Sequence, residues 1–344
     1  MIETLWFVLL AAMLAVYVIL DGFDLGAGMV HLFAARTDAE RRQVLASIGP
    51  VWDGNEVWLL AAGGTLYFAF PDLYASSFSG FYLPLMMVLW LLILRGIAIE
   101  FRNHIESPVW TPLWDVVFAG ASTLLAVFFG AALGNVIRGV PLDDRREFFL
   151  PLWTDFTPGG EVGILDWYTV PVGLLTAAAL LLHGALWVQL KTTGPVHDRA
   201  AAIANPAAAI AAVLTAAVTV LTFAVQPQLA ANLAAHPWGA LLPLIAVGGL
   251  IGVALLRADE RGRFLSSCFY LGGMLSSAAF GLFPNVLPGV GGAASLTVYN
   301  AAAPAHGLRI GLFWWIPGVL IAIAYAFFLY GKFSGKVLDP KPDQ

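Results

Sequence analysis

Residues 5–32 read LWFVLLAAMLAVYVILDGFDLGAGMVHL, and this stretch decides what kind of protein the chain forms. It is apolar from Leu5 to Leu20, and a bilayer-spanning α-helix needs about 20 such residues. A helix is the structure to expect, because every backbone polar group must be paired inside lipid. The stretch then reaches two aspartates, Asp21 and Asp24, which are costly inside a membrane and are therefore informative.

Similar stretches recur along the whole chain. Of its 344 residues, 60% are hydrophobic and only 11% are charged, whereas soluble domains have about 25% charged residues. Strict alternation of polar and apolar residues, the mark of a membrane β-barrel, is absent from the sequence. We therefore predict an all-α integral membrane protein, a single membrane domain of residues 1–344 with nine transmembrane helices. The predicted spans are at about 5–32, 45–69, 78–100, 114–137, 166–190, 202–225, 239–256, 264–283 and 308–331.

Lysines and arginines predict how the chain crosses the membrane. Twelve of them follow the odd-numbered spans, and four lie in the loops on the other side. Positive residues gather in the cytoplasm. The N-terminus is thus expected outside, and the C-terminus in the cytoplasm.

Several classes of site are excluded by composition. The chain has one cysteine, Cys268, so the sequence predicts neither a disulfide framework nor a cysteine-ligated metal. No basic patch of the kind that nucleic acid needs is present in the sequence. Of the six histidines only His183 lies well inside a predicted span, and we interpret it as a hydrogen-bonding partner between helices rather than a haem ligand.

Ionisable residues inside the membrane are confined to the first four spans. With the predicted topology all of them fall in the cytoplasmic half, and they are Asp21, Asp24, Asp53, Glu56, Arg95, Glu100 and Asp115. Residues three apart share a helix face, as Asp21 and Asp24 do. A row of carboxylates that opens to the cytoplasm suits a proton inlet. The alternatives are that Arg95 only neutralises buried acids and that Asp115 is merely solvated near the interface.

Two motifs identify a family. DGFDLGAGM at 21–29 and PVWDGNEVWL at 50–59, together with Leu94-Arg95-Gly96, resemble subunit II of the cytochrome bd family of quinol oxidases. Shorter matches are 62–64, 78–82, 134–135, 139–141, 281–284 and 295–297, so the resemblance extends to about residue 331.

The resemblance implies a terminal oxidase of aerobic respiration in the bacterial cytoplasmic (inner) membrane, which oxidises a membrane quinol and reduces oxygen to water. Subunit I carries the b- and d-type haems, and subunit II packs against it as a heterodimer, often with a small single-span accessory subunit. Subunit II has two four-helix bundles plus one peripheral helix. It normally binds no haem, although some members hold a structural quinone. No catalytic residue and no metal are therefore expected in this chain.

The resemblance also carries residue roles. The proton-path acids of the family match Asp24 and Asp53, its intramembrane arginine matches Arg95, and Glu100 matches an acidic position. The family supports a role for Glu56 less well, because other members have glutamine at this position. The expected mechanism is that Asp53 and Asp24 relay protons from the cytoplasm, that Arg95 with Glu100 sets the charge balance, and that the protons pass to the haem sites of the partner.

Two other functions stay open at this point. A proton-coupled secondary transporter would use buried acids to bind its coupling ion, and it would be functional without a haem partner. A purely structural assembly subunit would use its acids only to pair with Arg95, and neutralising Asp53 would then impair assembly rather than turnover.

Overall fold

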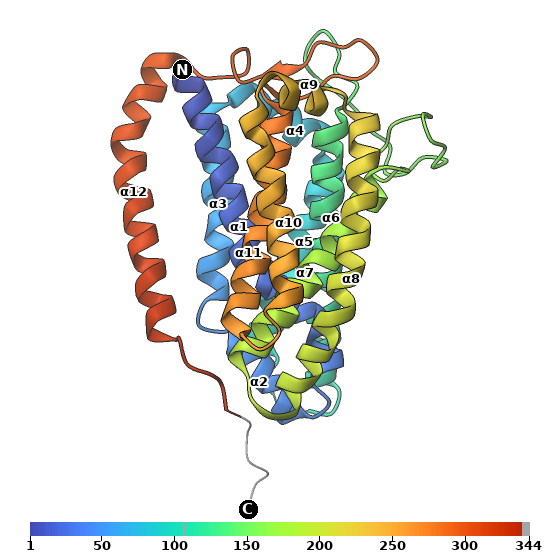
Figure 1. Cartoon of the computed structure of the whole chain (residues 1–344). Coiled ribbons are helices and arrows are strands. Elements are labelled where there is room, and N and C mark those ends of the chain that lie inside the picture. The colour runs from blue at the N-terminus through green and yellow to red at the C-terminus, as the bar shows by residue number, and fades with distance from the viewer. Residues whose placement is uncertain (106, 339–344) are drawn as a thin grey trace, which may run out of the picture.

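Long α-helices run side by side through most of the chain, and short segments cap the two ends of the bundle (Figure 1). The computed structural model describes residues 1–105 and 107–338. The helices are α1 Ile2–Ala34, α2 Asp38–Ile48, α3 Trp52–Ala69, α4 Pro71–Gly80, α5 Tyr82–Phe101, α6 Trp110–Arg138, α7 Thr169–Lys191, α8 Gly194–Val225, α9 Gln228–Ala235, the short 3-10 helix η1 Pro237–Ala240, α10 Leu241–Leu255, α11 Glu260–Leu282 and α12 Ala305–Lys332. The two strands are β1 Asn285–Leu287 and β2 Leu296–Thr297, which pair antiparallel.

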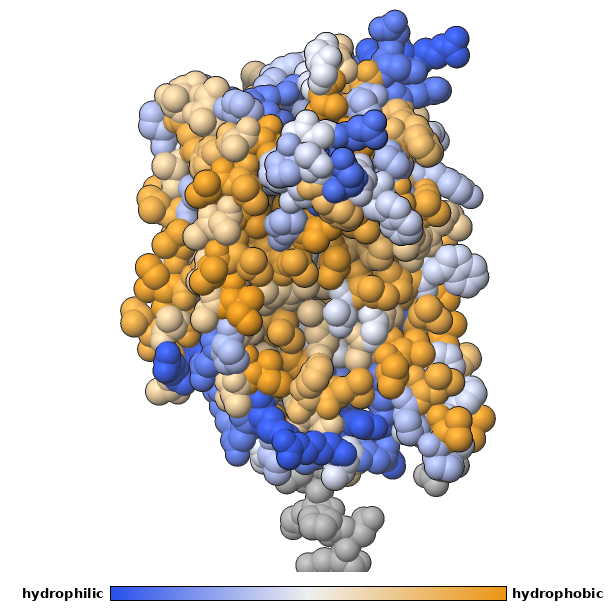
Figure 2. Space-filling model, turned by 90° about the vertical axis from the view of Figure 1, so that its right-hand side faces the viewer, coloured by the Kyte–Doolittle hydropathy of each residue, from blue (hydrophilic) through white to orange (hydrophobic). Residues whose placement is uncertain are grey.

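The membrane character of the chain is confirmed. Within residues 1–105 and 107–338, eight helical segments are long and apolar enough to cross a bilayer, namely α1, α5, α6, α7, α8, η1 with α10, α11 and α12. On the face shown in Figure 2, apolar side chains form a broad middle band and hydrophilic ones gather toward both ends. This distribution is typical of a protein whose sides contact lipid.

The second predicted span, 45–69, is wrong as a single helix. The chain breaks between Ile48 and Trp52 into α2 and α3. Helix α2 starts at a capping box, in which Thr37 Oγ1 accepts from Glu40 N at 3.2 Å and Glu40 Oε2 accepts from Thr37 N at 3.2 Å. Helix α3 is not among the eight apolar segments, because polar residues occupy its first two turns. The count of nine spans therefore stays a prediction.

Other boundaries differ by a few residues, as expected for helix ends. The third span is preceded by a separate helix, α4, which meets α5 at Phe81. Helix α8 begins at Gly194 rather than near 202, because its first turns are polar and lie beyond the apolar run. The apolar run of a sequence corresponds to the part of a helix that lies in lipid, whereas the backbone hydrogen bonds of the helix continue beyond that run.

Helix α1 lies among α3, α6 and α7 and contacts all three. The approach of α1 to α7 depends on two glycines. A Cβ at Gly26 would lie 2.1 Å from the Leu180 carbonyl oxygen, and a Cβ at Gly184 would lie 2.1 Å from the Gly26 carbonyl carbon. Small residues permit such close backbone contact in membranes. The contact fixes the rotation of α1, and with it the direction in which Asp21 and Asp24 face.

The end of the bundle at which α1 begins, called here the N-terminal end, is covered by two long connections. They join each other through backbone hydrogen bonds from Val140 N to Pro288 O at 2.9 Å and from Val290 N to Val140 O at 3.0 Å. Arg146 Nη1 also donates to Asn300 O at 2.9 Å. These connections form a cover rather than a separate domain.

Helix α12 lies at the edge of the molecule, apart from most other helices (Figure 1). After it, residues 333–338, called here the C-terminal strap, run beside the opposite, C-terminal end of the bundle. Val337 N donates to Lys191 O at 2.6 Å, and Lys191 Nζ donates to Gly335 O at 2.7 Å. The strap therefore ties α12 to α7. The division into two four-helix bundles remains a prediction.

Candidate functional site

The deepest charged site lies between α1, α3 and α5. Arg95 from α5 donates through Nη1 to Asp21 Oδ1 at 2.7 Å and through Nη2 to Glu56 Oε2 at 2.9 Å. The side chains of Asp21 and Arg95 are fully buried, whereas that of Glu56 is 24% exposed. One arginine thus joins a carboxylate of α1 to a carboxylate of α3.

Asp24 belongs to the same site but pairs with an amide. Asn55 Nδ2 donates to Asp24 Oδ2 at 2.7 Å, and Tyr330 Oη donates to Asn55 Oδ1 at 2.7 Å. We call Asp21, Asp24, Asn55, Glu56 and Arg95 the buried acid cluster. Asn55 is the residue that our sequence interpretation missed, although it lies inside the quoted motif. Tyr330 comes from 275 residues further along the chain and gave no sequence signal.

Several polar atoms of this cluster remain unpaired. Asp21 Oδ2, Asp24 Oδ1, Arg95 Nε and the nearby Tyr17 Oη are buried without a hydrogen-bond partner among the described residues. Buried polar groups that lack a protein partner commonly bind ordered water. The cluster also holds three carboxyl groups and one guanidinium, which pairs with only two of them, and excess negative charge is costly away from water. The cluster is therefore suited to hold water and to take up a proton.

Two predicted site residues lie outside the cluster. Asp53 and Glu100 are exposed on the surface of the chain, and neither carboxylate has a hydrogen bond or ion pair among the described residues. Arg95 pairs with Asp21 and Glu56 rather than with Glu100. The expectation that Arg95 and Glu100 act together is not supported by this geometry, whereas the pairing of Arg95 with Asp21 and Glu56 agrees with the alternative in which Arg95 neutralises buried acids.

Asp115 belongs to a second site at the C-terminal end of the bundle, and the idea that it is merely solvated is wrong. Its carboxylate is fully buried and lies 2.6 Å from His31 Nε2 and 2.6 Å from Arg102 Nε. Arg41 Nη1 is 2.9 Å away, and Arg102 Nη2 reaches Asp38 Oδ1 at 2.8 Å. We call these five residues the Asp115 cluster. It joins the ends of α1, α5 and α6 to α2.

The charge of Arg102 is set by opposing effects. Burial disfavours its guanidinium, but the ion pairs with Asp115 and Asp38 prevail and raise the pKa of Arg102 above its ordinary value. Arg102 therefore stays positive. The Asp115 cluster is rich in arginine, whereas the buried acid cluster is rich in carboxylates.

His183 has the structural role predicted for it. Its Nδ1 lies 2.7 Å from Ser267 Oγ of α11, and its Nε2 lies 2.9 Å from the Ile19 carbonyl oxygen of α1. Both ring nitrogens are thus used between helices. Within residues 1–105 and 107–338, no group of three or more histidine, cysteine or acidic side chains could hold a metal ion.

Comparisons with known proteins agree over nearly the full chain. A family model described as cytochrome bd terminal oxidase subunit II matches residues 2–333. The cytochrome bd-I ubiquinol oxidase subunit 2 of Escherichia coli K12 is 30% identical over 97% of this chain and 94% of its own length. The cytochrome bd ubiquinol oxidase subunit 2 of Bacillus subtilis 168 is 28% identical, over 90% and 89%.

The fold has a solved counterpart. A chain of the bd oxidase from Geobacillus thermodenitrificans is similar in structure, with a TM-score of 0.77. The match covers 96% of this chain and 98% of the Geobacillus chain. Because the sequences are only 18% identical, this likeness supports the fold alone.

Proposed function

The chain belongs to the cytochrome bd terminal oxidase subunit II family, and we propose that it carries protons toward an oxygen-reducing partner subunit. As a member of that family it is a subunit of a membrane oxidoreductase complex with a subunit I partner. The transporter alternative has no support in these comparisons. The observation that carries the proposal is the buried acid cluster, in which Asp21 and Glu56 share Arg95, Asp24 pairs only with an amide, and two carboxylate oxygens have no hydrogen-bond partner among the described residues.

The finer assignments follow the family and are part of the same proposal. The haems of b and d type belong to subunit I, this chain holds none, and the quinone and a small accessory subunit join the complex. The membrane is the bacterial cytoplasmic membrane. The C-terminal end of the bundle faces the cytoplasm, in line with the lysines and arginines there.

Glu56 connects the cluster to the surface. It is the partly exposed member of the buried acid cluster and lies three residues after the exposed Asp53 on α3, so the two share a helix face. Protons would pass from Asp53 to Glu56 and on to Asp21 and Asp24 through bound water. This order gives Glu56 a larger role than the family resemblance alone did.

The partner would cover the face formed by α3 and α5. Asp53 is followed on its helix face by Leu60, which is 72% exposed. On α5, Glu100 lies seven residues after the exposed Ile93 and therefore on the same face of the helix. Acidic side chains on a lipid-facing surface are costly, so a protein partner is the better neighbour for this face.

The test is to neutralise the cluster in the assembled oxidase. Asp24→Asn and Glu56→Gln should each lower oxygen consumption about tenfold, less than the roughly 100-fold that a positioned acid or base contributes, because water offers a bypass. Haem content and subunit ratio should stay unchanged. Asp155→Asn, in an exposed loop, is the matched control. If turnover is normal in fully assembled variants, the relay role is wrong. If the variants fail to assemble with haem, the structural role is the better explanation.

A further inference from the structure

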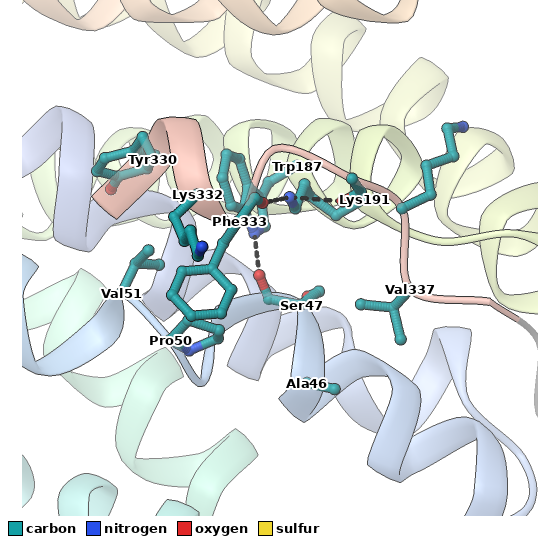
Figure 3. A pocket seen from close by; sticks show the side chains of 12 residues that line it. Ala46, Ser47, Pro50, Val51, Trp187, Lys191, Tyr330, Lys332, Phe333 and Val337 are labelled. Atoms are coloured by element: carbon teal, nitrogen blue, oxygen red, sulfur yellow. Dashed lines mark hydrogen bonds between the residues drawn. The ribbon is translucent and has the colours of Figure 1, made fainter. Parts of the chain in front are cut away.

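A pocket opens at the C-terminal end of the bundle (Figure 3). Its volume is about 280 Å³, close to the lower end of the roughly 300–1,000 Å³ of known ligand pockets. Three parts of the chain form its walls: the turn between α2 and α3, the end of α7, and the end of α12 with the C-terminal strap. Trp187 Nε1 donates to Ser47 O at 3.2 Å and holds two of these walls together.

The pocket is positively charged. Lys191, Lys332 and Lys336 line it, and among residues 1–105 and 107–338 no aspartate or glutamate does. Lys336 Nζ is 2.6 Å from Glu260 Oε2 and is thereby neutralised. Lys191, only 8% exposed, donates to the carbonyl oxygens of Phe333 and Gly335, which orient its ammonium but do not cancel its charge.

Lys332 is the more available of the two remaining cations. It lies beside the Phe333 ring in Figure 3, and its ammonium has no partner among the described residues. The pocket thus presents two uncompensated positive charges within an otherwise largely apolar wall. An anionic group is the complement of this arrangement.

An apolar groove adjoins the pocket. It lies between α3 and α12, has a volume of about 480 Å³, and is lined by residues such as Trp58, Leu329 and Ala322. Tyr330 lines both the groove and the pocket, so the two are adjacent. An apolar groove beside a cationic pocket at the end of a membrane bundle matches an amphiphile with an anionic head.

We propose that this site binds an anionic phospholipid, with its phosphate between Lys191 and Lys332 and one acyl chain in the groove along α12. A neutral lipid or an uncharged isoprenoid would fill the groove but leave both ammonium groups without a counter-charge. Basic pockets between membrane helices on the cytoplasmic side are known to hold anionic headgroups. The lipid would fill the space between α12 and the bundle.

The test measures lipid binding rather than oxidase activity. The oxidase complex is purified through a tag on this chain, stripped of lipid in detergent, and titrated with phosphatidylglycerol or phosphatidylethanolamine under native mass spectrometry. We expect the complex to prefer phosphatidylglycerol, and Lys332→Gln to weaken its binding about fivefold, as expected for one lysine at a membrane surface. Lys332 has no partner to lose within the part of the chain that the structure describes, so this variant should fold normally.

A second pair of variants tests the acyl chain. Ala322→Phe fills the groove and should also weaken phosphatidylglycerol binding, whereas Ala324→Phe on the same helix lies outside the groove lining and should not. Arg257→Gln removes an exposed cation at the same end of the bundle and is the charge control.

Several outcomes would overturn the proposal. Equal binding of the two lipids would remove the headgroup argument, as would an equal loss in Arg257→Gln. Displacement of the lipid by inorganic phosphate alone would mean that the pocket binds free phosphate and no acyl chain. A loss with Lys332→Gln and none with Ala322→Phe would contradict the placement of the chain in the groove.

Discussion

At the scale of single residues, Arg95 holds two helices through two carboxylates. Its guanidinium donates to Asp21 with one nitrogen and to Glu56 with another. A planar fork can satisfy both partners at once, whereas a lysine ammonium is a single point charge. The buried acid cluster therefore depends on this side chain for its geometry as well as for its charge.

We predict that Arg95→Gln lowers the yield of assembled oxidase. Removing one member of a buried ion pair typically costs about 3–5 kcal/mol, because the remaining charge is left uncompensated. Arg95→Lys should fall between this variant and the wild type. The yield of haem-containing complex in membranes, measured by the reduced-minus-oxidised spectrum, checks the order.

A double variant separates charge from shape. Asp21→Asn combined with Arg95→Gln removes both charges of the pair, so assembly should recover relative to Arg95→Gln alone. An equally poor yield of the double variant would show that the guanidinium acts through its hydrogen bonds and packing, and the charge explanation would then fail.

At the scale of elements, α2 is a short polar helix that is attached to the rest of the molecule by ion pairs. Hydrogen bonds and ion pairs with Arg42 and Arg102 outweigh the effect of burial and lower the pKa of Asp38 below its ordinary 3.8. Arg199 and the backbone N–H groups of Arg36 and Thr37 similarly outweigh burial and lower the pKa of Glu40 below 4.5. Both carboxylates are more acidic in the folded state.

This predicts how the attachment of α2 depends on pH. A carboxylate with a lowered folded-state pKa stabilises the fold fully above its ordinary pKa, and the stabilisation is lost as the pH falls through the folded-state value. The thermal unfolding midpoint of the purified oxidase should therefore decrease as the pH falls below about 5. In Asp38→Asn with Glu40→Gln this decrease should be shallower, and an identical pH profile in both proteins would contradict the prediction.

The sequence predicted some elements better than others, for a physical reason. Apolar runs locate helices inside lipid, and charges within those runs stand out, so Asp21, Asp24 and Arg95 could be identified as a site. Which side chains meet depends on how each helix is rotated, and contacts such as that of Gly26 with Gly184 set the rotation. Amides and phenols give no comparable signal, and the break between α2 and α3 lies at residues 49–51, inside a run that reads as one span.

At the scale of the whole molecule, the chain has different faces. The α3 and α5 face carries Asp53 and Glu100 among apolar side chains, whereas α8 exposes apolar residues such as Val213. Sequence periodicity shows that a helix has an apolar side, but it does not distinguish a side that meets lipid from one that meets protein. The exposed carboxylates make that distinction only once their surroundings are known.

We predict that Leu60→Gln weakens binding of subunit I. Leu60 is 72% exposed on the proposed partner face, and Val213, 68% exposed on α8, provides a matched control as Val213→Gln. A polar side chain at a packed interface leaves an unsatisfied group and costs about 1–3 kcal/mol. Co-purification of the haem subunit with tagged chain measures the effect, and an equal loss in both variants would argue against this face as the interface.

The position of Asp24 along α1 also determines how much of the transmembrane voltage a proton crosses to reach it. It is ten residues from the end of the helix at Ala34, or about 15 Å of a helix about 50 Å long at 1.5 Å per residue. In the proposed orientation, a proton that reaches Asp24 from the cytoplasm crosses roughly three-tenths of the transmembrane voltage, about 0.7 kcal/mol per 100 mV. Most of the voltage would then lie beyond the cluster, so filling the buried acids would depend only weakly on membrane potential.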